Sequence, residues 1–329
     1  MARQHRLWRI LNGNKSAHLL PELEPLKPYA EIDILTDDSK LPEILGNYDL
    51  YITALRPPFK EEYLANCGKL KAIATPTTGL DHLPAPAIRK KGIKLIGLRE
   101  NPELLKKVTS TAEMAWTLLL SLIRHIPEAS QSSLSGKWER DRFIGTQLSG
   151  KTMGIIGYGR LGRMVGRYAQ AFGMKVYAND TNPDIVPEPG IEMVPLEKLL
   201  AEADAVSIHI HLDPVNVGFF DRAKFEMMKK EAVLVNTSRG AVINEQDFLQ
   251  ALESGRIAGA AVDVIAGEGG DLSQNCLIQY AKTHHNMVIT PHCGGASYEA
   301  QKFTFADIIR RVKEYIIETG DPDSVTISE

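Results

Sequence analysis

A glycine-rich turn between a strand and a helix constrains the fold of this chain more than any other feature. Gly157 ends the apolar segment KTMGIIG, and Gly159 and Gly162 follow it. A helical pattern and a second strand, MKVYAND, come after these glycines. The second strand ends at Asp180, 18 positions after Gly162. This order of strand, G-x-G-x-x-G, helix, strand and acidic residue is typical of the βαβ unit that binds a dinucleotide.

Each residue of this motif has a physical role. Gly157 permits a tight turn, Gly159 lets the backbone approach a pyrophosphate, and Gly162 allows close packing of helix and strand. The N-terminus of the helix offers N–H groups and a positive dipole end to phosphates. Asp180 suits the two hydroxyls of an adenosine ribose and would repel a 2′-phosphate, which favours NAD over NADP. The glycine pattern alone also suits S-adenosylmethionine in a methyltransferase, so it indicates a nucleotide and not a reaction.

Short apolar segments alternate with helical patterns along nearly the whole chain, which indicates repeated βα units and parallel sheets. The strands expected in a first block are EIDILT, YDLYITA, KLKAIAT and GIKLIGL, with helices at FKEEYLANCG and PAPAIRKKG. Those of a second block are KTMGIIG, MKVYAND, ADAVSIHI, AVLVNTS, AGAAVDV and NMVITP, with a helix at INEQDFLQALESG. We therefore predict an α/β fold of two doubly wound, Rossmann-like parallel-sheet domains with the active site in the cleft between them.

Two long helical patterns suggest where the domains divide. The pattern from Ser110 to about Ser130 is too long for a connection within one βαβ run, so we expect it to cross between domains. The final pattern, from about Tyr298 to Thr319, follows the last strand and is expected to return to the first block. The prediction is a discontinuous substrate domain of residues 1–108 and 298–329, and a nucleotide-binding domain of residues 109–297.

Charge and cysteine content narrow the class of partner. The chain has 38 Lys and Arg against 41 Asp and Glu, a net charge of −3, which provides no field for nucleic acid or an anionic membrane. Three cysteines without metal-type spacing favour a reducing, cytoplasmic location and no metal site. The N-terminus lacks the apolar run of a signal peptide. The apolar run AWTLLLSLI is too short to span a bilayer and predicts a buried helix that suits a subunit contact.

Three segments of the second block place a polar residue at or after the end of an expected strand, where open α/β sheets bind ligands. They are VNTSRG with Arg239, VDVIAGEGG with Glu268, and ITPHCGG with His292. Arginine binds carboxylates with two parallel hydrogen bonds, and a histidine beside a carboxylate can exchange a proton near neutral pH. Singly, each residue has an ordinary alternative: a surface ion pair, a solvated loop acid and a packed loop histidine. Together, and after a nucleotide motif, they indicate a catalytic group.

These segments carry a resemblance to a known family. Asn236 to Gly240 fits Asn-x-x-Arg-Gly, Asp263 to Glu268 fits Asp-Val-x-x-x-Glu, and Thr290 to His292 fits Thr-Pro-His. In this order, after the glycine motif, they resemble the D-isomer-specific 2-hydroxyacid dehydrogenase family. The resemblance covers nearly the whole chain and is strongest from about Glu113 to Ser297. The upstream segment TPTTGLDHL is similar to the substrate loop of that family.

The resemblance implies a reaction and roles for the residues. A hydride passes between C4 of the nicotinamide of NAD and C2 of a 2-keto or 2-hydroxy acid. His292 exchanges the proton of the C2 oxygen, Glu268 keeps His292 basic and oriented, and Arg239 binds the substrate carboxylate and polarises the carbonyl. Backbone amides around Thr78 and Gly79 hold the same carboxylate.

The resemblance also implies a cofactor site and an assembly. The expected cofactor-binding residues are Gly157, Gly159, Arg160, Leu161, Gly162, Asp180, His209, Thr237, Ser238, Asp263, Gly294 and Gly295. Members of the family are usually dimers through the cofactor domain, and the apolar helix from Ala112 to Arg124 is compatible with a homodimer.

Some positions depart from the family pattern. Gly269 stands where proline is usual in the family. The interval from Glu268 to His292, 24 positions, is longer than is typical of the family, so we expect the loop GGDLSQNC to be remodelled. His211 replaces a proline beside the expected cofactor edge. A wall of the cofactor pocket is the favoured interpretation of His211, and a catalytic role is the alternative.

The ending PHCGGAS, followed by Glu299 and Ala300, resembles the phosphoglycerate dehydrogenase branch of the family. Arg56 falls where that branch places a basic residue, and it would suit the phosphate of 3-phosphoglycerate or a similar substrate; a structural or solvated arginine is the alternative. Because the chain ends soon after its last helix, we expect no regulatory C-terminal domain. An NADH-sensing, corepressor-like binding protein of the same fold is the alternative function. A formate dehydrogenase is disfavoured, since that branch has glutamine where Glu268 stands.

Overall fold

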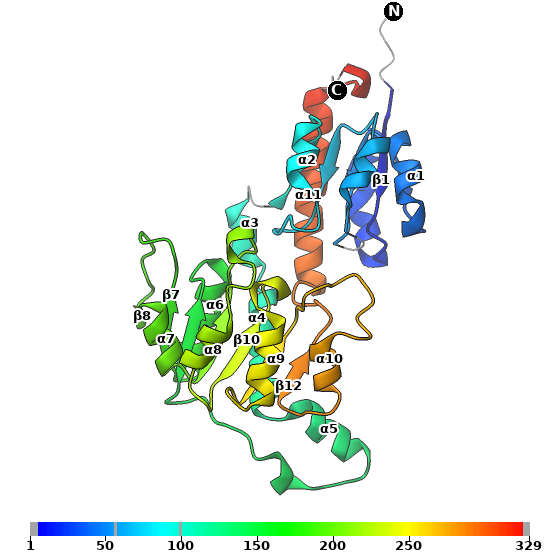
Figure 1. The fold of residues 1–329 in the computed structure, drawn as a ribbon. Coiled ribbons are helices and arrows are strands. Elements are labelled where there is room, and N and C mark those ends of the chain that lie inside the picture. Colours follow the sequence, from blue (N-terminus) through cyan, green and yellow to red (C-terminus); the bar gives the residue numbers. More distant parts are fainter. Residues whose placement is uncertain (1–5, 56–57, 99–100, 325–329) are drawn as a thin grey trace, which may run out of the picture. The chain divides into compact units, whose positions relative to one another are not determined.

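Two parallel β-sheets, each with its own helices, make up the computed structural model, which describes residues 6–55, 58–98 and 101–324 (Figure 1). The sheets belong to two units of the chain. Unit 1 comprises the described residues of Met1–Val108 and Ala296–Glu329, and unit 2 comprises Thr109–Gly295. The predicted α/β class with two doubly wound parallel sheets is confirmed.

The sheet of unit 1 has five parallel strands in the order β2-β1-β3-β4-β5. Their bounds are β1 Trp8–Asn12, β2 Ala30–Ile34, β3 Leu50–Ile52, β4 Ala72–Ala74 and β5 Lys94–Ile96. The α-helices of this unit are α1 Leu41–Ile44, α2 Ala85–Lys90, α3 Pro102–Lys107 and α11 Tyr298–Thr319, and its 3-10 helices are η1 Ala17–Leu26, η2 Asp38–Lys40, η3 Leu45–Asn47, η4 Glu61–Asn66 and η9 Pro322–Ser324.

Alternating side chains of the strands supply two cores, one on each face of this sheet. Ile10 of β1 belongs to the core that α11 covers through Phe305 and Ile308. Leu11, the next residue, belongs to the opposite core together with Tyr51. This period of two explains why a short apolar strand can be buried on both faces.

Two local predictions for unit 1 were incomplete or wrong. Strand β1 was not predicted, because exposed Arg9 interrupts its apolar residues. The segment FKEEYLANCG was expected to be an α-helix and contains the 3-10 helix η4. No side chain caps its start, and i to i+3 bonds close its ends, from Tyr63 N to Lys60 O and from Cys67 N to Leu64 O.

The sheet of unit 2 has seven parallel strands in the order β12-β11-β10-β9-β6-β7-β8. Their bounds are β6 Thr152–Ile156, β7 Lys175–Asn179, β8 Ile191–Met193, β9 Ala205–Ile208, β10 Val233–Asn236, β11 Gly259–Val262 and β12 Met287–Ile289. The short edge strand β8 was not predicted. The α-helices are α4 Ser110–Ile123, α5 Ile126–Leu134, α6 Arg160–Ala171, α7 Leu196–Glu202, α8 Arg222–Met227, α9 Glu245–Glu253 and α10 Cys276–Ala281, and the 3-10 helices are η6 Arg140–Phe143, η7 Pro214–Asn216 and η8 Gly240–Val242.

The helix expected from Ser110 to about Ser130 is broken, which corrects that prediction. It ends at Ile123, and His125 takes a left-handed backbone conformation with φ of 52° before α5 begins. Pro127 stands in the first turn of α5, where its missing N–H is tolerated. Helix α4 lies within unit 2, where its apolar face packs on α6 and the sheet, so the expected buried helix is present.

Among the described residues, no helix is both long and apolar enough to cross a bilayer. The longest helix of the described residues is α11. It carries charged residues along its length and lies against η1 in unit 1 (Figure 1).

Candidate active site

Three neighbouring strands of unit 2 bring the three predicted catalytic residues to one edge of the sheet. Strands β10, β11 and β12 are adjacent and parallel, so their carboxyl ends lie at the same edge. Arg239 follows β10, Glu268 follows β11, and His292 follows β12. The sheet order therefore gathers three residues that are spread over more than fifty positions of the chain.

The imidazole of His292 is bonded to the carboxylate of Glu268. The distance from Nδ1 of His292 to Oε2 of Glu268 is 2.6 Å, and each side chain is less than one-fifth exposed. The other oxygen of Glu268, Oε1, accepts a hydrogen bond from the backbone N–H of Ile265 at 3.1 Å. With Nδ1–H donated to a carboxylate, Nε2 is the ring nitrogen left to exchange a proton with a ligand.

Asp263 fixes the loop that carries His292. Its carboxylate is 1% exposed and accepts hydrogen bonds from Gly294 N at 2.7 Å, Cys293 N at 2.9 Å and the Thr290 hydroxyl at 2.5 Å. His292 has a φ of 53°, and its N–H donates to Asp263 O at 2.8 Å. These bonds hold a histidine in the left-handed region, which non-glycine residues rarely adopt.

A cysteine follows the histidine directly. Burial and the neighbouring Asp263 carboxylate raise the pKa of the Cys293 thiol above its ordinary value. The group beside His292 is therefore a neutral thiol near neutral pH.

The Arg239 loop is fixed by Asn236 and by a glycine. The buried amide of Asn236 donates to Arg239 O at 3.0 Å and accepts from Ser238 N at 3.0 Å. A Cβ at Gly240 would lie 2.0 Å from the carbonyl carbon of Ile265, so only glycine fits there. The loops of Arg239 and Glu268 therefore touch through their backbones.

The glycine motif has the geometry of a tight strand-to-helix turn. Gly157 has a φ of 91°, and a Cβ at Gly162 would lie 2.2 Å from Gly157 O. Gly159 is the N-cap of α6, has no side-chain cap, and has open space around the position of a Cβ. The first N–H groups of α6 thus face a place that an anion can enter.

Asp180 is tied to this turn. One carboxylate oxygen accepts a hydrogen bond from Tyr158 N at 2.8 Å, and the other accepts from Asn182 N at 2.9 Å. The acidic residue therefore sits beside the loop between Gly157 and Gly159, although Asp180 follows a different strand, β7.

Two buried polar atoms at the same edge have no hydrogen-bond partner within the described chain. They are Nδ1 of His209, which follows β9, and Oγ1 of Thr237, which follows β10. The other ring nitrogen of His209 lies 2.9 Å from the Ser207 hydroxyl, and burial lowers the pKa of His209 to about 4. An uncharged imidazole, a free hydroxyl and the open turn at Gly159 fit a dinucleotide along this edge.

Of the remaining predicted cofactor residues, Arg160 and Leu161 begin α6, and Ser238, Gly294 and Gly295 lie in the loops after β10 and β12 of unit 2. His211 is exposed, and its carbonyl accepts a hydrogen bond from the Asn216 amide. No group of three His, Cys, Asp or Glu side chains placed to hold a metal occurs in the described ranges.

Of the predicted substrate residues, Thr78 and Gly79 belong to unit 1, and Arg239 belongs to unit 2. Thr78 and Gly79 lie in a loop after β4, where the Thr77 hydroxyl donates to Gly79 O at 2.8 Å. The Thr75 hydroxyl contacts Thr77 at 2.8 Å and Nε2 of His82 at 3.2 Å. Arg56 lies outside the described residues.

Sequence reasoning missed the residues that hold the loops. Asn236 and Thr290 stand in the motifs but received no role, and Glu245 was seen only as part of a helix. The carboxylate of Glu245 accepts hydrogen bonds from Ala266 N at 2.6 Å and from Nδ2 of Asn275 at 3.2 Å. The signal in the sequence that could have identified Glu245 is its position at the start of the helix that follows the Arg239 motif.

Comparison with known proteins gives a family. Residues 116–294 match the domain described as D-isomer specific 2-hydroxyacid dehydrogenase, NAD binding domain. A glyoxylate reductase of Thermococcus litoralis is 32% identical over 86% of this chain and 87% of its own length. A D-3-phosphoglycerate dehydrogenase of Synechocystis is 30% identical over 93% of this chain. The chain spans about half of the length of the phosphoglycerate dehydrogenases that it matches, 54% for Synechocystis and 42% for rat.

A solved structure agrees with this comparison. The D-lactate dehydrogenase of Aquifex aeolicus, complexed with NAD and lactic acid, superimposes with a TM-score of 0.81 at 25% identity, over 96% of this chain and 97% of its own. The matched domain lies inside unit 2, where the glycine turn and the His292–Glu268 pair are found. The chain belongs to the D-isomer-specific 2-hydroxyacid dehydrogenase family, and unit 2 carries the NAD-binding domain of that family.

Proposed function

We propose that the protein is an NAD-dependent dehydrogenase that transfers a hydride between NAD(H) and C2 of a D-2-hydroxy acid or the matching 2-keto acid. The observation that carries this proposal is the 2.6 Å pair of His292 and Glu268 at the same sheet edge as the glycine turn. A binding module needs no such pair, whereas reduction of a carbonyl needs a proton donor.

The chain's own residues account for the proton and the substrate charge. NAD(H), when bound, supplies or accepts the hydride at C4 of its nicotinamide. In the reductive direction, Nε2 of His292 gives a proton to the C2 oxygen, and the carbonyl becomes a hydroxyl. Glu268 stabilises the imidazolium and fixes its orientation through Nδ1. Arg239 binds the substrate carboxylate, as the amides around Thr78 and Gly79 would also do.

The cofactor is held by the loops of unit 2. The open N-terminus of α6 suits the pyrophosphate, and Asp180 suits the ribose hydroxyls. The uncharged His209 and the Thr237 hydroxyl offer hydrogen bonds to polar groups of the dinucleotide. His211 serves as a wall of the same pocket.

We propose a small 2-keto acid as substrate, with phosphohydroxypyruvate, the keto form of 3-phosphoglycerate, among the candidates. The names of the relatives, phosphoglycerate dehydrogenase, glyoxylate reductase and D-lactate dehydrogenase, support the class and differ in the side chain. The discriminating experiment follows NADH absorbance with glyoxylate, pyruvate, hydroxypyruvate and phosphohydroxypyruvate in parallel. We expect turnover of at least one of them; NADH binding without any turnover would favour the corepressor-like alternative.

We propose different functions for the two units of the chain. We propose that residues 1–108 and 298–329 form the substrate domain and residues 109–297 the cofactor domain, bounds that differ from those of units 1 and 2 by two residues. The return of α11 to unit 1 supports this division, since Phe305 and Ile308 complete one core of the unit 1 sheet.

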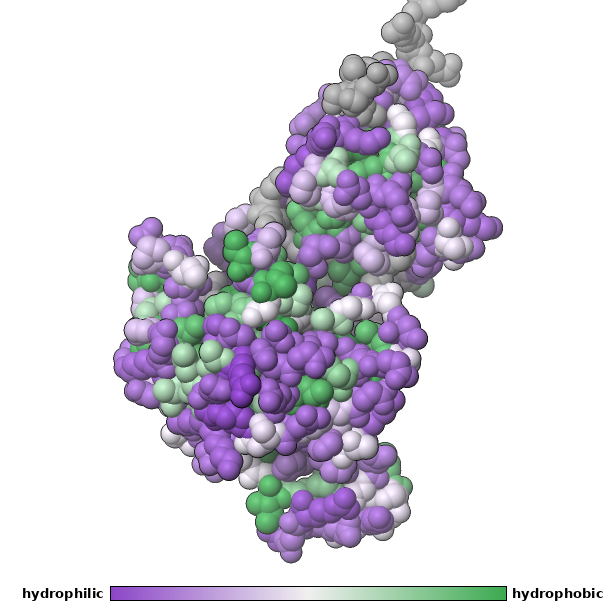
Figure 2. All heavy atoms as spheres, in the orientation of Figure 1, coloured by the Kyte–Doolittle hydropathy of each residue, from purple (hydrophilic) through white to green (hydrophobic). Residues whose placement is uncertain are grey.

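We also propose a homodimer in the cytoplasm. The segment of α5 and η6 exposes Leu134, Trp138 and Ile144, which are 86%, 89% and 77% accessible, and Figure 2 shows hydrophobic residues on this part of unit 2. Surfaces of this kind are typical of subunit contacts. A sedimentation experiment at micromolar concentration tests the dimer, with Trp138→Lys expected to give monomers. The three free cysteines support a reducing compartment.

A further inference from the structure

One carboxylate outside the catalytic group closes the loop that carries Glu268. Glu245 is the first residue of α9, and its two oxygens bind both ends of the segment from Ala266 to Asn275. Oε1 accepts from Ala266 N at 2.6 Å and Oε2 accepts from Nδ2 of Asn275 at 3.2 Å. Glu268 lies between these two anchors.

The anchored segment would otherwise be free to change shape. Gly267 and Gly269, on either side of Glu268, have φ values of 75° and 96°, and the flanking residues are mostly polar. Glycine has the largest backbone freedom of any residue, so Glu268 stands in a part of the chain with little intrinsic order. A contact that closes the segment reduces the number of conformations that it can adopt.

The anchor connects directly to the catalytic pair. Ala266 N is bound to Glu245, and the preceding N–H, that of Ile265, is bound to Oε1 of Glu268. The other oxygen of Glu268 is bound to Nδ1 of His292. The peptide between Ile265 and Ala266 is also the place where Gly240, next to Arg239, makes its close approach. A shift of this one peptide therefore displaces Glu268 relative to both His292 and Arg239.

We infer that Glu245 is a positioning residue for the proton transfer, acting through the Ile265–Ala266 peptide on Glu268 and His292. This inference rests on the proposed function, because it assigns a task in the same reaction. Glu245 binds Ala266 N and the Asn275 amide and acts on the reacting groups only through Glu268, so it is a positioning residue and not a catalytic one.

The orientation of the Asn275 amide makes a sharp test available. Its Oδ1 accepts hydrogen bonds from Leu277 N and Ile278 N at the start of α10, so its NH2 group must face Glu245. Glu245 thus meets two donors. In Glu245→Gln the amide can accept from only one of them, and its own NH2 group faces the other. In Glu245→Gln/Asn275→Asp the new carboxylate can cap α10 and accept from the new NH2 group, which restores both contacts.

Four variants are compared with the wild type: Glu245→Gln, Asn275→Asp, the double variant, and Glu253→Gln as a matched control at the exposed end of α9. We expect each single variant to lower kcat about 10-fold with little change in melting temperature or in the KM for NADH. A larger solvent isotope effect on kcat should accompany the loss, because the proton transfer becomes slower. The double variant should return to within about threefold of the wild type, and Glu253→Gln should be unchanged.

Hydrogen exchange of the segment 263–276 supplies a readout that does not need turnover. Exchange should be faster in both single variants and return to the wild-type rate in the double variant. Single variants with unchanged kcat and isotope effect, or a double variant that is no better than the singles, would overturn the inference. If the wild type turns over no 2-keto acid, the proposed function fails, and unchanged exchange in the single variants would then reject the anchor as well.

Discussion

Unit 1 and unit 2 each contain a deeply buried aspartate, and the hydrogen bonds of these two aspartates fix different parts of the chain. Asp263 and Asp49 are both 1% exposed, and both accept at least three hydrogen bonds. The donors to Asp263 lie in the loop that carries His292. The donors to Asp49 are the Arg6 guanidinium, at 2.8 and 2.9 Å, and Arg9 N at 2.8 Å.

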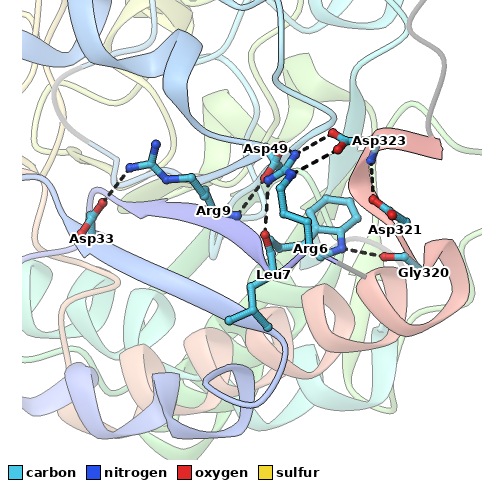
Figure 3. A network of polar contacts seen from close by, with 9 residues as sticks. Arg6, Leu7, Arg9, Asp33, Asp49, Gly320, Asp321 and Asp323 are labelled. Carbon is cyan, nitrogen blue, oxygen red and sulfur yellow. Dashed lines mark hydrogen bonds and ion pairs between the residues drawn. The ribbon is translucent and has the colours of Figure 1, made fainter. Parts of the chain in front are cut away.

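The cluster around Asp49 joins the two ends of the described chain. Arg6 also binds Asp323 at 2.8 Å, and Trp8 donates from its indole nitrogen to Gly320 O at 2.9 Å (Figure 3). The bonds to Asp49 and Asp323 raise the pKa of the Arg6 guanidinium above its ordinary value, so it stays charged. Each buried carboxylate fixes the backbone around it through its hydrogen bonds. Whether activity or only stability depends on the carboxylate follows from where its hydrogen-bond donors lie.

The largest effect should come from the catalytic pair in unit 2. His292→Asn removes the proton donor and keeps a side chain that tolerates left-handed backbone, so kcat should fall about 10³-fold. NADH affinity, measured by fluorescence titration, should change little because the glycine turn is untouched. A variant with near wild-type kcat would contradict the assignment of His292.

The next largest effect is expected at Asp263. Asp263→Asn keeps the shape but places an NH2 group against donors from Thr290, Cys293 and Gly294, so unfolding should require about 3 kcal/mol less free energy. Unlike the change at Asp49, this one should also lower kcat of the folded protein. Urea denaturation and steady-state kinetics on one preparation separate the two effects. A loss of stability with unchanged kcat would show that Asp263, like Asp49, affects only the stability of the protein.

His209 gives a pH-dependent effect of intermediate size. Its pKa is lowered to about 4 in the folded protein, whereas the unfolded chain takes up the proton near its ordinary pKa of 6.5. The unfolded state therefore binds more protons between these values, and stability must fall as pH falls from about 6.5 to about 4, by roughly 1–3 kcal/mol. His209→Gln should lose this component. Urea midpoints at about pH 7 and about pH 5 measure it, and equal pH dependence in both proteins would contradict the shift.

The smallest effect should come from the exposed arm of the Asp49 cluster. The side chain of Asp323 is 69% accessible, so Asp323→Asn should lower the free energy of unfolding only slightly, because solvent screens an exposed ion pair. Kinetic constants should stay unchanged. Asp49→Asn serves as the companion variant, with a clearly larger loss of stability expected because its carboxylate is buried. Equal losses in the two variants would show that burial does not govern this cluster.

Sequence patterns predicted unit 2 better than unit 1. In unit 2, long apolar segments and fixed motifs identified six strands and the order of the site loops, but not the three-residue edge strand β8. In unit 1, strand β1 was hidden by Arg9, whose side chain points away from the core and binds Asp33. The burial of strand β1 depends on the strands beside it in the sheet. A pattern within the sequence of one strand does not contain that information.

The side chains that we propose as catalytic could be selected from the sequence, whereas the residues that hold their loops could not. Arg239, Glu268 and His292 stand at fixed distances within recognisable motifs. Glu245 and Asn275 are thirty positions apart, and their contact depends on how α9 and α10 pack. The break at His125 also escaped prediction, although Pro127 interrupts the helical pattern and is a signal that a helix ends before it.

The contact at Gly240 has a consequence for how substrate preference can diverge in this chain. Because any side chain at Gly240 would push against the Ile265 carbonyl, the loops of Arg239 and Glu268 cannot be reshaped one at a time. A change that moves the Gly240–Ile265 contact disturbs both loops, and with them the groups proposed to bind the carboxylate and to transfer the proton. Selection for a new substrate, in nature or in the laboratory, should therefore leave Gly240 and the Ile265–Ala266 peptide unchanged and accumulate changes in the loops of unit 1 or away from this contact.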